Sequence, residues 1–335
     1  MTRSEATRII RAGEKIMTLS EMSETDSPAG ILEQPQPKRE QNKERTTFQT
    51  LIVLFKARVV SLLLLAAVGG AFMAAGGWPG LGTLLIVLSF GGLAAGGAAG
   101  LNQYLEQGTD AIMGRTRQRP LVTGELQPRW VLWVSASMVL LPSLVALLFN
   151  PALGLFLALG AFIYVGLYTI LLKPRTPLNI VIGGAAGSAA VMSGAAAAGN
   201  WQDPAVITLA LLLFLWTPSH FWSLSILYKD DYAKAGVPML PVYTTMKNAS
   251  WWVLLHTAAT GFVALLLAVS PSLGLAYFVP VLIATIDMIA RNIRLIREPT
   301  PQNARGLFIS SNIYLAVVLV AICAGTVIHS VWPPL

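Results

Sequence analysis

Hydrophobic residues occur in long runs along most of the chain, from residue 51 to the C terminus. A transmembrane helix needs roughly 20 predominantly apolar residues to cross about 30 Å of hydrocarbon, and each run reaches about that length. The breaks between runs contain Gly, Pro and Asn, which end helices. The pattern therefore predicts an all-α, polytopic membrane protein with one bundle of about nine transmembrane helices. The expected helices cover residues 52–76, 81–105, 130–149, 151–172, 178–198, 205–227, 250–269, 273–291 and 307–330.

The first 50 residues have a different composition, with acidic and basic residues in equal number up to Arg45 and no apolar run. A signal peptide requires an apolar core and a transit peptide is poor in acidic residues, so neither is expected here. Residues 1–50 are predicted to form a disordered cytoplasmic tail, with a weak helix near residues 5–17 as the alternative. Residues 51–335 are predicted to form the transmembrane domain.

The 23 Lys and Arg residues lie in the tail and at alternate connections between the apolar runs. They occupy the segment up to Arg58 and then residues 115–129, 173–175, 229–247 and 291–305, while the other connections carry none. Because Lys and Arg are enriched in cytoplasmic loops, this alternation places the N terminus in the cytoplasm and the C terminus outside. The expected location is the inner membrane of a bacterial cell.

The amino-acid composition excludes several classes of protein. Charged residues make up 12% of the chain and the mean hydropathy is +0.64, whereas a soluble domain has about 25% charged residues. A soluble enzyme or a nucleic-acid-binding domain is therefore excluded, and no nucleic-acid partner is expected, although the net charge is +7. The single cysteine, Cys323, rules out a disulfide framework and a cysteine-based metal cluster.

Chemistry is expected in the two long connections on the basic side, residues 106–129 and 228–250, because both also contain acidic residues. In the first, Asn102, Glu106 and Asp110 are four residues apart, so on a helix each is rotated by only about 40° from the last and all three share one face. An amide oxygen and two carboxylates suit Mg²⁺ that also binds substrate phosphates. Arg115 and Arg119 follow, and guanidinium groups pair well with phosphate. The alternative is that the arginines only mark the cytoplasmic side and pair with the acids.

The second connection again places two adjacent carboxylates, Asp230 and Asp231, at the inner end of a membrane helix and beside Tyr232. Two acidic groups on the same side of the membrane, in different loops, can face each other across the mouth of a bundle. The sequence therefore predicts an active site at the cytoplasmic side.

These motifs resemble the UbiA-type intramembrane prenyltransferase superfamily and, within it, the protoheme IX farnesyltransferase family. The resemblance extends over about residues 51–245. The matching positions are Asn102, Glu106, Asp110, Arg115, Arg119, Pro120, Lys56, Arg58, Lys173, Thr176, Asn179, Pro218, His220, Asp230, Asp231, Tyr232, Gly236 and Met239.

The resemblance implies nine transmembrane helices, Mg²⁺ as cofactor, and transfer of farnesyl from farnesyl diphosphate to a vinyl group of haem B, giving haem O and diphosphate. It implies the lipid bilayer, and haem A synthase or oxidase assembly factors, as partners. The implied catalytic residues are Asn102, Glu106, Asp110, Asp230, Asp231 and Lys173, and all of these except Lys173 are the implied metal ligands. The implied substrate-binding residues are Arg115, Arg119, Lys56, Arg58, Tyr168, Asn179, His220 and Tyr232.

The sequence departs from the family pattern at several positions. Glu106 stands where Asp is usual, and Ala57 and Ser219 stand where Pro is expected. Which of Asp230 and Asp231 meets the metal is open. For His220 two roles are considered: its imidazole ligates haem iron, or it forms a hydrogen bond inside the bundle.

Two other functions remain as alternatives. One is a prenyltransferase acting on an aromatic quinone precursor. The other is an ion-coupled transporter, although a transporter should carry its acidic residues near the middle of the bilayer rather than at one side.

Overall fold

The computed structural model describes residues 45–331, and every regular element in that range is a helix. The predicted disordered tail lies outside the described residues up to Glu44 and stays a prediction there; its last residues enter α2, which starts at Thr47. The helices are α2 (Thr47–Leu54), α3 (Ala57–Ala75), α4 (Leu81–Ile86), η2 (Val87–Gly91), α5 (Gly92–Leu105), α6 (Gln107–Ile112), α7 (Pro120–Thr123), α8 (Pro128–Phe149), α9 (Pro151–Ala161), η3 (Phe162–Leu172), α10 (Asn179–Gly183), α11 (Ala185–Ala197), α12 (Pro204–Leu227), α13 (Lys229–Lys234), α14 (Leu240–Tyr243), α15 (Met246–Leu267), α16 (Gly274–Arg297) and α17 (Pro301–Val331).

Within residues 45–331, nine helical segments are long and apolar enough to cross a membrane, which confirms the predicted fold class. Three of the spans join shorter pieces, namely α4 with η2 and α5, α9 with η3, and α10 with α11. The break between the third and fourth spans is sharp because Asn150 caps α9, its side chain accepting a hydrogen bond from the Leu153 amide, and Pro151 takes the first helical position.

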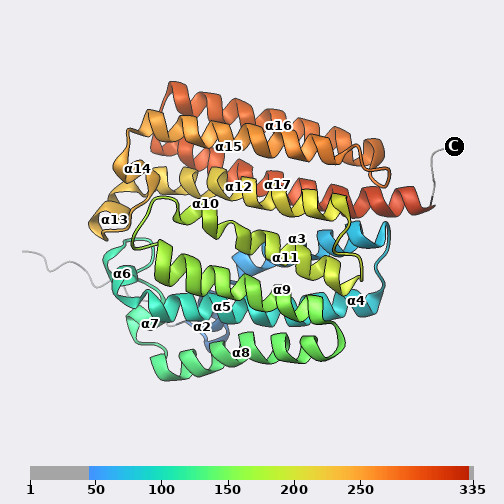
Figure 1. Ribbon diagram of the computed structural model, residues 1–335. Coiled ribbons are helices and arrows are strands. Elements are labelled where there is room, and N and C mark those ends of the chain that lie inside the picture. Colours follow the sequence, from blue (N-terminus) through green and yellow to red (C-terminus); the bar gives the residue numbers. More distant parts are fainter. Residues whose placement is uncertain (1–44, 332–335) are drawn as a thin grey trace, which may run out of the picture. The chain divides into compact units, whose positions relative to one another are not determined.

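The spans run side by side, and the short helices α6, α7, α13 and α14 gather at one end of the bundle, on the left in Figure 1. These short helices form the two long connections that carry the acidic motifs. The topology therefore brings both connections to the same end, as the charge pattern predicts.

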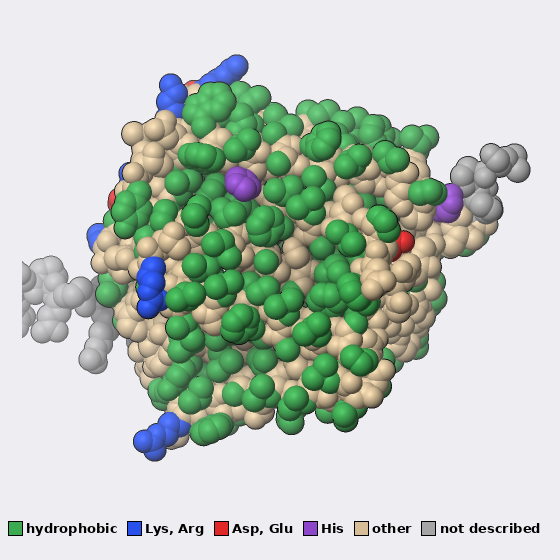
Figure 2. Space-filling view, viewed as in Figure 1, with side chains coloured by type: hydrophobic (Ala, Val, Ile, Leu, Met, Phe, Trp, Pro, Cys, Tyr) green, Lys and Arg blue, Asp and Glu red, His purple; other side chains and the backbone are tan. Residues whose placement is uncertain are grey.

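The side chains on the outside fit a lipid environment. Figure 2 shows hydrophobic side chains over most of the visible face, with Lys and Arg near its edges, several of them on the left. Leu148 on α8 is 87% exposed and Leu275 on α16 is 76% exposed. In water such a surface would be unfavourable, whereas lipid tails cover it at no cost.

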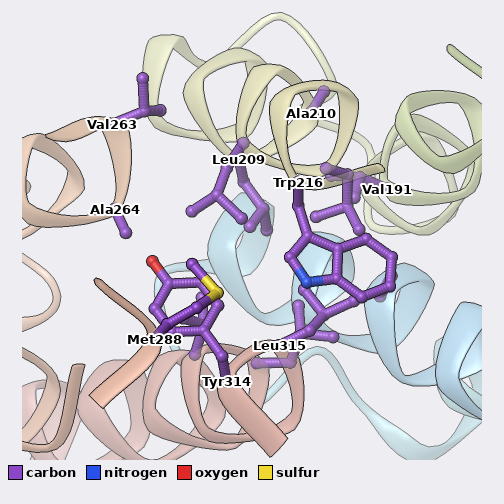
Figure 3. Packing of buried hydrophobic residues seen from close by; sticks show 14 of the residues in the cluster. Val191, Leu209, Ala210, Trp216, Val263, Ala264, Met288, Tyr314 and Leu315 are labelled. Atoms are coloured by element: carbon purple, nitrogen blue, oxygen red, sulfur yellow. The ribbon is translucent and has the colours of Figure 1, made fainter. Parts of the chain in front are cut away.

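The interior holds larger side chains where α12 packs against α11, α15 and α17. Figure 3 shows Trp216 of α12 pointing between α11 and α17, with Val191 and Leu315 close by. The indole nitrogen of Trp216 donates a hydrogen bond to the Ser311 carbonyl at 2.9 Å. A buried indole therefore has its polar group satisfied inside the bundle.

Small residues let α3 and α11 approach each other closely. A Cβ built on Gly194 would overlap the Ala67 carbonyl oxygen, and one built on Gly70 would overlap the carbonyl of Val191. Close backbone contact through small residues is a common way for membrane helices to associate.

Gly194→Ala is therefore expected to lower the free energy of unfolding by about 1–3 kcal/mol, the usual cost of overpacking. The backbone carbonyl of Ala67 cannot rotate away as a side chain could. Gly82→Ala is the matched control, since no atom from another part of residues 45–331 lies within 4 Å of the added Cβ. Thermal unfolding in detergent compares the two variants, and equal midpoints would contradict the close contact.

Candidate active site

The first motif lies where α5 passes into α6. Glu106 forms the junction between the two helices, with φ −98° and ψ 9°, so the chain stays nearly helical from Asn102 to Asp110. All three motif side chains are buried, at 2% exposure for Asn102, 8% for Glu106 and 3% for Asp110. Buried carboxylates need partners, because an isolated charge removed from water is costly.

Each motif residue contacts a different basic side chain. The Lys56 ammonium donates to Asn102 Oδ1 at 2.5 Å, and Arg119 Nη1 donates to Asp110 Oδ2 at 2.5 Å. The Lys173 ammonium donates to Glu106 Oε1, and Arg119 lies 3.9 Å from Glu106 Oε2. We call these six residues the ionic cluster: Lys56, Asn102, Glu106, Asp110, Arg119 and Lys173.

The backbone at Lys56 is unusual. Among residues 45–331, Lys56 is the only non-glycine with a positive φ, at 49° in the left-handed region. It separates α2 from α3, and its side chain reaches Asn102 and the Tyr164 hydroxyl, the latter at 3.1 Å. A left-handed conformation in a residue with a Cβ costs free energy and is concentrated at functional sites.

The helix η3 supplies the opposite wall of the site. It is a π-helix of 11 residues, and its i to i+5 hydrogen bonds widen the turn, so that residues four or five apart align on one face. Tyr164 and Tyr168 are stacked, with ring centroids 5.9 Å apart. The Thr169 hydroxyl accepts from Asn102 Nδ2 at 3.0 Å, and Lys173 follows the last turn.

Tyr164 and Thr169 were not singled out from the sequence. The sequence of residues 151–172 reads as one apolar helix, and its hydropathy does not distinguish a π-helix from an α-helix. With α-helical spacing the two side chains would lie on different faces.

The second motif meets the first at Gly114. A Cβ built on Gly114 would lie 3.4 Å from Asp231 Oδ2, and the Arg115 guanidinium lies 5.6 Å from the Tyr228 ring centroid. Asp230 is exposed, whereas Asp231 is half-buried and turned toward the first connection. Of the two adjacent aspartates, Asp231 is therefore the one that the fold brings toward the Glu106 side.

The other residues predicted to bind substrate differ in burial and in position. Asn179 is buried, and its Nδ2 donates to the Thr176 and Pro238 carbonyls at 2.6 and 3.3 Å, which links α10 to the second connection. Its Oδ1 is buried without a hydrogen-bond partner in the described part of the chain. Tyr232 is the buried residue of α13, at 5% exposure. Arg58 is exposed on α3, and the structure does not bring it to the ionic cluster.

His220 lies in a separate position on α12. Its imidazole is stacked between Trp216, at 4.4 Å between centroids, and Phe308, at 4.6 Å. Its Nδ1 is hydrogen-bonded to the Ser311 hydroxyl at 2.9 Å. The ring is therefore held in one orientation by α17, with Nδ1 already engaged.

The charges of the ionic cluster do not cancel. With every group in its usual state, three cations face two carboxylates, so the cluster has an excess of one positive charge. Burial, with Arg119 next, lowers the pKa of Lys56 to about 7. Burial alone would raise the pKa of Glu106, but Lys173 and Lys56 lower it below its usual value. Burial raises the pKa of Asp110 despite Arg119. With Lys56 protonated, the excess positive charge makes the cluster suited to receive an anion.

The oxygen atoms of Asn102, Glu106 and Asp110 suit Mg²⁺ if phosphate oxygens of a substrate complete its coordination. Within residues 45–331 no three His, Cys, Asp or Glu side chains come together as a possible metal site. Mg²⁺ is commonly bound by one or two carboxylates together with water and phosphate oxygens, so two carboxylates and an amide are enough. A closed site made only of protein ligands is not what this donor set provides.

Residues 62–318 match the UbiA prenyltransferase family. The chain belongs to this family. The relatives include a protoheme IX farnesyltransferase from Sulfolobus acidocaldarius, 41% identical over 81% of this chain and 93% of the relative. Another, from Metallosphaera sedula, is 38% identical over 80% of this chain and 93% of the relative.

Solved structures of other proteins share the fold of this chain. A digeranylgeranylglyceryl phosphate synthase structure has a TM-score of 0.69 at 18% identity and covers 84% of this chain and 98% of its own. A UbiA homologue from Archaeoglobus fulgidus, bound to GPP and Mg²⁺, has a TM-score of 0.59 at 16% identity, covering 82% and 99%. At these identities the likeness establishes the fold alone.

Glu106→Gln is expected to lower the free energy of unfolding by about 3 kcal/mol, because it leaves the partly buried Lys173 without its carboxylate partner. Lys173→Met in the same chain should restore much of that loss, since the double variant removes both charges. Arg45→Met is the control, because its pair with Glu125 is about a third exposed and such pairs contribute at most about 1 kcal/mol. Additive losses in the double variant, measured by denaturation in detergent, would contradict the pairing.

Proposed function

We propose that this enzyme transfers the farnesyl group of farnesyl diphosphate to a vinyl group of haem B, giving haem O and diphosphate. The observation that carries the proposal is the buried, cation-rich ionic cluster, placed next to a second acidic motif at one end of the bundle. The protoheme IX farnesyltransferases, 36–41% identical over most of the chain, support haem as the acceptor.

The diphosphate binds at the ionic cluster. Lys173 and Arg119 have long side chains whose cationic ends can reach phosphate oxygens, and Arg115 belongs to the same connection as Arg119. Asn102, Glu106, Asp110 and Asp231 would hold Mg²⁺, which as a Lewis acid stabilises negative charge on the phosphate oxygens. The exposed Asp230 would contact Mg²⁺ from the outer side of the site, through a bridging water molecule.

Transfer begins when the bond between C1 of the farnesyl group and the diphosphate oxygen breaks, with the electron pair leaving on oxygen. Lys173, Arg119 and Arg115 stabilise the charge that develops there. The allylic cation left behind must be shielded from water. The stacked faces of Tyr164 and Tyr168 are suited to this, since aromatic rings attract a cation within about 6 Å.

The vinyl π electrons of haem then form the new carbon–carbon bond with C1. This leaves a positive charge on the other vinyl carbon, next to the porphyrin, where addition of water and loss of one proton give the hydroxyl group of haem O. Atoms and charge balance without an oxidant.

For haem, His220 is the candidate axial ligand. Its Nδ1 is hydrogen-bonded to the Ser311 hydroxyl. A hydrogen bond to one ring nitrogen orients an imidazole so that the other, here Nε2, can bind a metal. The stacking by Trp216 and Phe308 removes the ring's rotational freedom before haem arrives. Tyr232, Asn179, Lys56 and Arg58 stay further candidates for contacts with the two substrates.

The two alternative functions receive less support. A quinone-precursor enzyme of the family would share the diphosphate site, but nothing favours an aromatic acid over haem here. A transporter would need its acidic groups within the bilayer, whereas Glu106, Asp110 and Asp231 lie at one end of the bundle.

Membranes containing the protein are expected to convert haem B and farnesyl diphosphate into a farnesylated, hydroxylated haem, detected by mass spectrometry. Arg119→Ala should raise KM for the diphosphate substrate by at least tenfold while leaving haem affinity nearly unchanged, because a charge-assisted hydrogen bond is lost. The exposed Arg117→Ala is the matched control. Prenylation of an aromatic acid instead of haem would overturn the acceptor assignment.

His220→Ala is expected to weaken haem binding at least tenfold and to change the Soret band of the bound haem, while the affinity for farnesyl diphosphate stays constant. His256→Ala, on the neighbouring α15, is the control, because His256 contacts Trp222 rather than α17. An unchanged Soret band in the His220 variant would show that the imidazole only packs inside the bundle.

We also propose that the protein lies in the inner membrane of a bacterial cell with its N terminus in the cytoplasm, where haem A synthase or oxidase assembly factors would be its neighbours. Reporters fused after Leu335 and within residues 106–129 should then report opposite sides of the membrane. Signals from the same side would contradict the orientation.

A further inference from the structure

We propose that the outward-facing surface of α16 and α17 binds an anionic phospholipid, with the Arg291 guanidinium as the main contact to the lipid phosphate. The site lies apart from the ionic cluster and goes beyond the proposed reaction. Its parts are an arginine held by an ion pair, two further arginines, and isoleucines on both helices.

An ion pair on the outside of α16 holds Arg291 in place. The Arg291 Nε donates to both carboxylate oxygens of Asp287, at 3.0 Å to Oδ1 and 2.8 Å to Oδ2. The Ser310 hydroxyl of α17 donates to the same Oδ2 at 2.7 Å. The carboxylate is therefore fixed by both helices, and it fixes the guanidinium through Nε.

This pairing leaves the two terminal nitrogens of Arg291 available. In the described part of the chain Nη1 and Nη2 donate no hydrogen bond, and the side chain is 44% exposed. A Cβ built on Gly306 would lie 3.7 Å from Nη1, so the guanidinium extends from α16 across to α17. Guanidinium nitrogens donate well to phosphate oxygens. An oxyanion is therefore the ligand that suits this position.

The depth of the pair indicates that a polar group must cover it. Asp287 lies 13 residues beyond Gly274, the first residue of α16, which is about 20 Å along the helix axis. Because hydrocarbon is about 30 Å thick, the pair lies inside the span and not beyond its end. The Asp287 side chain is 49% exposed, and ionised groups in hydrocarbon are costly. Lipid tails give the free N–H groups no acceptor, whereas a lipid phosphate does.

The two helices present matching exposed stripes, basic toward one end and apolar further along. The exposed residues are Arg294, Arg291 and Ile283 on α16 and Arg305, Ile309 and Ile313 on α17. Residues four apart share a helix face, and α16 packs against α17. Because only residues 298–300 separate them, the helices run in opposite directions and their arginines lie at the same end. Figure 2 shows Lys and Arg side chains at the left end of α16, beside a hydrophobic surface.

An anionic phospholipid matches both parts of this surface. Its phosphate would meet the arginines, and an acyl chain would lie along the isoleucines. Three arginines and Asp287 leave a net charge of +2, which favours a lipid of net negative charge over a zwitterionic one. A free phosphate would gain nothing from the isoleucines. A second copy of this chain would place the same positive charges face to face, because a twofold interface pairs identical surfaces.

Native mass spectrometry of the full-length protein in detergent tests the proposal, because it gives the Kd of the first bound lipid. The probes are phosphatidylglycerol and phosphatidylcholine with the same acyl chains, and glycerol 3-phosphate as the free anion. The wild type is expected to bind phosphatidylglycerol about tenfold more tightly than phosphatidylcholine, because each nearby arginine attracts the net negative charge. Glycerol 3-phosphate should bind at least about a hundredfold more weakly, since it buries no acyl chain.

Variants locate the site. Arg291→Gln and Arg305→Gln should each weaken binding of the first phosphatidylglycerol about fivefold, the usual contribution of one basic residue near anionic lipid. Arg129→Gln is the matched control, because Arg129 is exposed at the start of α8, at the same end of the bundle. Arg305 has no ion-pair partner within residues 45–331. Its variant therefore tests the site even if loss of the Arg291 pair prevents folding.

Four results would overturn the inference. They are equal affinity of the wild type for the two lipids, an equal loss in the Arg129 variant, tight binding of glycerol 3-phosphate, and a lipid-free dimer that the Arg291 variant dissociates. The last of these would make the surface an interface between two copies of the chain. Turnover enters none of these measurements, so failure here leaves the proposed function intact.

Discussion

A buried charge must be matched by an opposite charge, and this requirement organises the end of the bundle where α5 passes into α6. Glu106 and Asp110 are buried at the junction of α5 and α6, and each contacts a cation from a different part of the chain. Lys173 follows the fourth span and Arg119 precedes α7, so pairing connects segments far apart in sequence. Removing one partner from such a pair costs more free energy than the pair contributes, which makes the arrangement specific even where it is not strongly stabilising.

Two local departures from regular backbone serve this pairing. The positive φ of Lys56 lies between α2 and α3, and its partly buried side chain contacts Asn102. The π-helix η3 brings Tyr164 and Thr169 onto one face, where each completes a hydrogen bond of the same network. Both conformations are less favourable than an α-helix and persist because the contacts they allow compensate for them.

These departures mark the limit of what the sequence predicts. Hydropathy predicts the nine spans, and the positions of Lys and Arg predict that both acidic motifs lie at the same end of the bundle. Both predictions succeed because the length of an apolar run and the charge of a loop are local properties of the sequence. The shared face of Asn102, Glu106 and Asp110 also follows from spacing alone. The partners of these residues do not, since a hydrogen bond from Lys56 to Asn102 depends on how α2, α5 and η3 pack. The distinction between Asp230 and Asp231 likewise needs the approach of α13 to Gly114.

The position of Lys173 bears on the glutamate at residue 106. Lys173 follows directly after η3, and its ammonium contacts Oε1 of Glu106 while Arg119 lies 3.9 Å from the other oxygen. An aspartate here would draw the carboxylate back toward α5 by about one carbon–carbon bond, roughly 1.5 Å. Lys173 would then have to extend further or lose its carboxylate partner, because η3 fixes the position of the Lys173 backbone. The longer side chain is thus matched to the opposite wall of the site, and its charge pairs with the cations that we propose to stabilise a leaving diphosphate.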